Sequence, residues 1–109
     1  AVLWAALRLD VWTVRTVAAN LDHITLNQRR RVSPLNGSLD PMQFAVKLKT
    51  IPQMHFSGGA DKIIPDWVAT RFAAAVGTSC AQTFVARGVE HIAGWKPFWL
   101  QNFRHLPTC

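Results

Sequence analysis

The sequence predicts an α/β protein in which about three parallel strands are flanked by helices. Short apolar or β-branched segments alternate along the chain with segments of helical pattern, and Gly or Pro separates them. Alternation of this kind is typical of parallel strands joined by crossover helices. Half of the 109 residues are apolar, which is enough for one ordinary domain and excludes a wholly disordered chain.

The first part of the chain contains one predicted strand. Residues 1–9 combine alanine, leucine and tryptophan and are typical of the end of a helix. Residues 11–19 (VWTVRTVAA) are rich in β-branched residues and predict a strand. Residues 20–40 are mostly polar, with a turn signal over 33–38, and predict no regular element.

The second part alternates helix and strand. Asp40 followed by Pro41 predicts a helix start, because Asp is a favoured N-cap and Pro suits the first helical position. Gly77 predicts the end of the central helix. The predicted elements are a short helix over 41–49, a strand over 53–57, a helix over 65–76, a strand over 82–87 and a helix over 94–105.

Composition and charge exclude several classes of protein. The longest apolar run, residues 1–7, is far shorter than the ~18 residues of a membrane-spanning helix, so we expect no transmembrane span. Two cysteines exclude a disulfide-rich scaffold and a four-cysteine zinc site. The apolar start, without Met or a cap residue, predicts that the chain is the C-terminal part of a longer protein. The compartment is left open.

Asp61 and His91 are the candidate catalytic residues. Each follows a predicted strand, and the carboxyl ends of neighbouring parallel strands meet at one edge of a sheet. A carboxylate that accepts from the imidazole Nδ1–H fixes the tautomer and leaves Nε2 free as a base. The alternatives are a turn-capping role for Asp61 and an ordinary loop histidine at position 91. Asp66 has the position of a helix-dipole residue rather than a reactive one.

These residues resemble the end of an α/β-hydrolase. Residues 55–65 (HFSGGADKIIP) contain G-x-x-D-x-x-x-P, and Val89-Glu90-His91 follows the last strand, with Trp95 behind it. The resemblance extends weakly upstream over residues 16–23. It implies a partial α/β-hydrolase fold, in which residues 1–109 form the C-terminal part of a single domain. It also implies an acid at Asp61, a general base at His91, an ester or acyl substrate, and no cofactor or metal.

The chain departs from that family in one respect. It contains no G-x-S-x-G, so the nucleophile elbow and its oxyanion-hole amide are missing, and we expect no appreciable esterase activity from the chain alone. Cys80 is excluded as a substitute because it precedes a strand that His91 follows, and Ser57 is better suited to packing. The partner implied is the missing N-terminal half, which would also cover the free edge of the strand over 11–19.

The competing hypothesis is a non-catalytic relic or a basic interaction module. The net charge is +6, and the basic run of residues 29–31 could bind nucleic acid or a protein partner. No aromatic residue interleaves this run, so a solvated loop is favoured and nucleic acid is not the expected partner. Histidines 23, 55 and 105 are expected to be surface or structural residues, and His105 with Cys109 makes only a weak metal pair. Trp95, Phe98, Trp99 and Phe103 predict an apolar stripe packed on the sheet rather than on a membrane.

Overall fold

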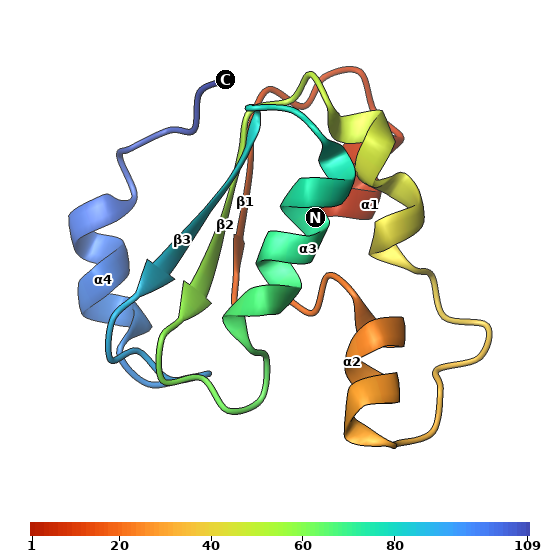
Figure 1. Ribbon diagram of the computed structural model, residues 1–109. Helices are drawn as coiled ribbons and strands as arrows, with labels where there is room; N and C mark the ends of the chain where they lie inside the picture. The colour runs from red at the N-terminus through yellow and green to blue at the C-terminus, as the bar shows by residue number, and fades with distance from the viewer.

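A computed structural model describes residues 1–109 and contains one open sheet of three parallel strands, in the order β1-β2-β3 (Figure 1). This confirms the predicted small α/β fold. The elements are α1 (Val2–Ala6), β1 (Val14–Val17), α2 (His23–Arg30), the 3₁₀ helix η1 (Pro41–Leu48), β2 (Gln53–Gly58), α3 (Asp66–Val76), β3 (Ala81–Ala86) and α4 (Trp95–Asn102). None of the helices combines the length and apolar content that crossing a bilayer requires.

The two faces of the sheet are covered unequally. Figure 1 shows α1, η1 and α3 on one side of the strands and α4 alone on the other. The first side holds the main core, in which Leu48, Val68 and Phe72 are fully buried. Both faces of a parallel sheet need cover, so the face under α4 is the weaker half of this fold.

The aromatic stripe of α4 packs against the sheet, but only in part. The ring of Phe56 on β2 lies 5.5 Å from that of Phe98 and 5.9 Å from that of Trp99. No α4 residue is buried, and Phe103, just past the helix, is 41% exposed. The predicted stripe therefore forms a half-buried layer rather than a core.

Three predicted elements differ in the structure. Residues 20–40 were expected to be irregular, but α2 forms there because Asp22 caps it by accepting a hydrogen bond from the Thr25 amide at 3.1 Å. The strand predicted over 11–19 is shortened to Val14–Val17, and Ala18, with φ +48°, turns the chain away directly after it. The helix predicted over 41–49 is a 3₁₀ helix over Pro41–Leu48.

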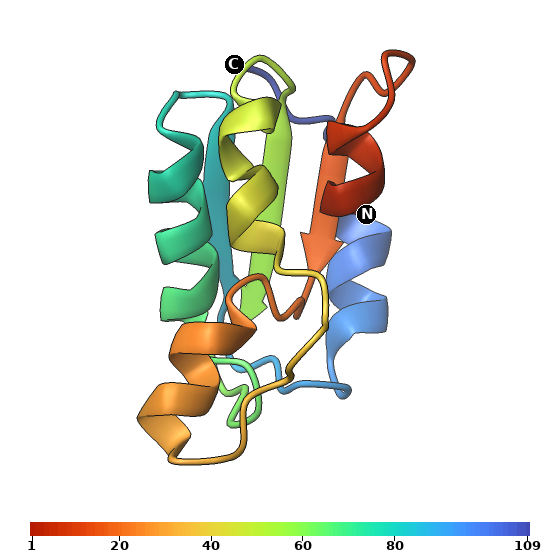
Figure 2. The same ribbon diagram turned by 90° about the vertical axis from the view of Figure 1, so that its right-hand side faces the viewer.

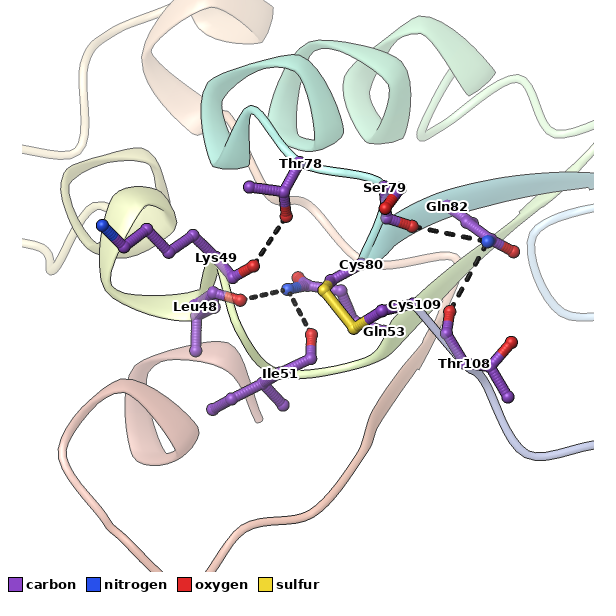
Figure 3. The surroundings of a disulfide bond; sticks show 10 residues. All are labelled: Leu48, Lys49, Ile51, Gln53, Thr78, Ser79, Cys80, Gln82, Thr108 and Cys109. Carbon is purple, nitrogen blue, oxygen red and sulfur yellow. Dashed lines mark hydrogen bonds between the residues drawn. A yellow bond between two sulfur atoms is a disulfide. The ribbon is translucent and has the colours of Figure 1, made fainter.

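A disulfide between Cys80 and Cys109 fastens the C-terminal tail to the amino end of the sheet (Figure 3). The Gln82 side chain also donates to the carbonyl of Thr108 at 3.5 Å, so the tail follows the start of β3. The structure therefore contradicts the weak metal pair suggested for His105 and Cys109, because the Cys109 sulfur is already bonded. No group of three His, Cys, Asp or Glu side chains is placed to hold a metal ion.

His55 lies at the centre of a buried polar network. The Gln53 amide nitrogen donates to the carbonyls of Leu48 and Ile51 at 2.9 and 3.0 Å, which leaves its oxygen to accept from His55 Nε2–H at 3.0 Å. His55 Nδ1 then accepts from the Thr16 hydroxyl at 2.8 Å. Burial lowers the pKa of His55 to about 4. His55 is thus a neutral structural residue.

Candidate active site

Gly58 and Gly59 bring the loop after β2 against the loop after β3. A Cβ at position 58 would lie 2.4 Å from the carbonyl oxygen of Val89, so only glycine permits this approach. The amide of Gly59 donates to the carbonyl of Ala86 at 2.8 Å, and the amide of Ala60 donates to the carbonyl of Val89 at 2.9 Å. The backbone thus joins the two loops immediately before Asp61 and His91.

Asp61 and His91 are in direct contact at the carboxyl ends of β2 and β3. The Nδ1 atom of His91 lies 2.9 Å from Oδ2 of Asp61, whose side chain is fully buried, while that of His91 is 31% exposed. The other oxygen, Oδ1, accepts from the amides of Ile63 and Ile64 at 2.8 and 2.9 Å. The contact expected from the sequence is present; the catalytic roles of the two residues stay a prediction.

The environment of Asp61 keeps its carboxylate ionised. Burial by itself would raise the pKa of Asp61, but hydrogen bonds from the Ile64 amide, the His91 ring and the Ile63 amide together outweigh burial and hold the pKa below its ordinary value. An ionised carboxylate only accepts hydrogen bonds, so His91 must carry a proton on Nδ1. The structure therefore assigns the Nδ1–H tautomer to neutral His91.

The second ring nitrogen of His91 has no hydrogen-bond partner in the protein. The loop that carries the ring is itself fixed, because Trp95 Nε1 donates to the His91 carbonyl at 3.1 Å and the Glu90 amide donates to the Ala93 carbonyl at 3.0 Å. A basic Nε2 on an oriented, partly exposed ring can remove a proton from a hydroxyl group brought to it.

A cavity of about 380 Å³ lies beside His91. It is lined by Ala60, Lys62, Ile63, Glu90, His91, Ile92 and Ala93. Its volume is within the range of small-molecule sites, and four of the seven lining residues are apolar. A cavity of about 430 Å³ between α2 and residues 32–40 contains neither Asp61 nor His91.

Neither Cys80 nor Ser57 is placed to act as the nucleophile in place of the missing serine. Cys80 is consumed by the disulfide and lies at the amino end of β3, the opposite rim from His91. Ser57 is buried within β2. Neither residue forms a hydrogen bond with His91.

Two arginines of the basic run are occupied by contacts within the protein. The guanidinium of Arg29 lies 4.0 Å from the ring centre of Trp67, and Arg30 donates to the carbonyls of Lys62 and Ile63. Arg31 alone is without a side-chain hydrogen bond or ring contact. All three arginines are exposed, as expected of a solvated run, but Arg29 and Arg30 belong to the end of α2 rather than to a loop.

The other histidines are placed as structural or surface residues. His23, at the start of α2, is buried and lies with Nε2 3.3 Å from the Leu39 carbonyl, and its Nδ1 has no partner. His105 is exposed.

The hydrogen bonds made around the pair were not predicted from the sequence. The amides of Ile63 and Ile64 donate to Asp61, and Arg30 donates to the carbonyl of Ile63; no sequence motif marks these contacts, because they depend on the geometry of the loop. Trp95 was noted behind His91 in the family resemblance, but its hydrogen bond to the His91 carbonyl was not predicted.

No protein-family model, curated protein or solved structure matches this chain.

Proposed function

We propose that this chain supplies the acid and the base of a serine ester or acyl hydrolase. The single observation that supports it is the 2.9 Å contact between His91 Nδ1 and Asp61 Oδ2. The contact joins two neighbouring parallel strands at their carboxyl ends, with Asp61 fixed by two amides and the opposite ring nitrogen free. Order and spacing of the G-x-x-D-x-x-x-P segment and His91 resemble those of α/β-hydrolases.

In the proposed reaction His91 acts as general base and then as general acid. Its Nε2 removes the hydroxyl proton from a serine outside residues 1–109, and the serine oxygen attacks the carbonyl carbon of the ester. Asp61 stabilises the imidazolium that forms and stays ionised. The proton on Nε2 then passes to the leaving alcohol oxygen as the tetrahedral intermediate collapses to an acyl-enzyme. In the second half of the cycle a water molecule takes the place of the alcohol.

The cavity beside His91 supports a substrate with an apolar portion. Ile63 and Ile92 contribute apolar side chains to it, and Lys62 and Glu90 lie at the same cavity. An uncharged acyl or alcohol group would bury apolar surface there, which contributes roughly 25 cal/mol per Å².

The first test is the coding sequence upstream of Ala1. We expect it to encode G-x-S-x-G in the segment that precedes α1. Absence of any such motif would favour the non-catalytic relic or interaction module.

The second test is hydrolysis of an activated ester by the protein extended to include that motif. His91→Ala should lower kcat by at least about 100-fold, the scale of a lost general base. The matched control is His105→Ala, which removes an exposed histidine and should leave kcat unchanged. Equal activity of the two variants would refute the assignment of His91. Residues 1–109 alone should show no hydrolysis above that of the double variant Asp61→Ala/His91→Ala.

A further inference from the structure

Helix α2 is polar, yet it is fixed to the protein at both ends. Its only buried residues are His23 and Leu26. At its start, Asp22 accepts from Arg71 Nε of α3 at 2.9 Å. At its end, Arg29 lies over the ring of Trp67, and Arg30 contacts the loop after β2. Figure 2 shows α2 beside the carboxyl ends of the strands, close to the loop that connects β2 with α3.

The contact made by Arg30 is with the loop that holds Asp61. Arg30 Nη2 donates to the carbonyl of Lys62 at 3.1 Å and to the carbonyl of Ile63. The amides of Ile63 and Ile64 in turn donate to Asp61 Oδ1. The carbonyl of Ile63 therefore accepts from Arg30, while the amide of Ile63 donates to Asp61.

This loop has little apolar packing of its own in front of Ile64. Lys62 is exposed and Ile63 is 52% exposed, whereas Ile64 is buried in the main core. A loop with few buried side chains opens easily, so its position depends on its polar contacts. Both hydrogen bonds come from Nη2, whose two N–H groups can each serve one of the adjacent carbonyls.

We propose that Arg30 is a positioning residue for the Asp61–His91 pair. Its guanidinium holds the carbonyls of Lys62 and Ile63, so that the amides of Ile63 and Ile64 hold Asp61 Oδ1 and direct Oδ2 at His91. This inference rests on the proposed function for its catalytic meaning, but its structural content is independent of hydrolysis. It also assigns α2 a role as the support of the acid loop.

The test is amide hydrogen exchange and ring-nitrogen NMR on the 109-residue chain, with a charge-preserving substitution. Arg30→Lys keeps the positive charge, but its ammonium nitrogen ends one bond short of the position of Nη2, so we expect it to lose the contacts with the two carbonyls. The matched control is Arg31→Lys, the same substitution at the neighbouring residue, whose side chain makes no hydrogen bond with the loop after β2. We expect amide exchange of Ile63 and Ile64 to become about tenfold faster in Arg30→Lys and to stay unchanged in Arg31→Lys. Arg30→Ala should have a larger effect than Arg30→Lys.

A second readout separates positioning from a general loss of stability. The amides of β2 should exchange at the wild-type rate in Arg30→Lys, while the His91 Nδ1–H signal should broaden. Unchanged exchange at Ile63 and Ile64 would overturn the proposal, as would equal acceleration at the amides of β2. Because neither readout needs a nucleophile, this inference can fail while the proposed function stands, and the reverse also holds.

Discussion

Acid should destabilise this protein through the buried ring of His55. In the folded chain the pKa of His55 is about 4, against an ordinary value of 6.5, because burial disfavours the charged ring. Between these values the unfolded chain binds more protons, so stability falls as the pH falls. Linkage with these two values gives a loss of about 2 kcal/mol between pH 7 and pH 5, out of at most about 3 kcal/mol below pH 4.

The assay is urea unfolding at pH 7 and pH 5 for the wild type, His55→Gln and His105→Gln. Glutamine at position 55 cannot titrate, so its unfolding free energy should change by about 2 kcal/mol less than that of the wild type over this interval. His105→Gln removes an exposed histidine and should behave as the wild type does. An NMR titration of the wild-type His55 ring provides a check that needs no variant. Equal pH dependence in all three proteins, or a titration of His55 near 6.5, would refute the reasoning.

Three further predictions concern stability and association. Replacing Cys80 and Cys109 by serine opens a loop with a sequence separation of 29 and should cost about 3–4 kcal/mol of unfolding free energy by the chain-entropy relation; an unchanged urea midpoint would contradict this. Gly58→Ala places a methyl group against the Val89 carbonyl and should cost about 1–3 kcal/mol; a stability equal to the wild type would show that the two loops can separate freely. The chain should self-associate in sedimentation velocity, because β1 is an edge strand whose Val17 is 40% exposed; a monomer at every concentration would count against an available edge.

The parts of this fold that follow local chemistry could be predicted from the sequence. Glycine and proline bound the strands and helices, so β2, α3 and β3 were predicted to within a few residues. Parallel pairing then required the segments after β2 and β3 to meet, which is why the contact between Asp61 and His91 could be anticipated. The catalytic meaning of that contact rests on resemblance.

The parts that depend on long-range contacts could not be predicted. Helix α2 lacks an apolar stripe, and it is held by Asp22 on Arg71 and by Arg30 on a loop 32 residues away. The disulfide could be predicted only by knowing that the C-terminal tail runs along β3, and no sequence pattern indicates that path. The burial of His55 could not be predicted either, because it depends on Thr16 from the neighbouring strand and on the orientation of the Gln53 side chain.

The tautomer of His91 tests the central claim most directly. The structure has Asp61 Oδ2 accept from Nδ1–H, so Nε2 must carry the lone pair. Ring nitrogen chemical shifts above pH 8 should therefore show a protonated Nδ1 and an unprotonated Nε2 in the wild type. Asp61→Asn should shift the proton to Nε2, because an amide NH₂ can donate to Nδ1. A wild-type ring protonated on Nε2, with the same shifts as Asp61→Asn, would contradict the account.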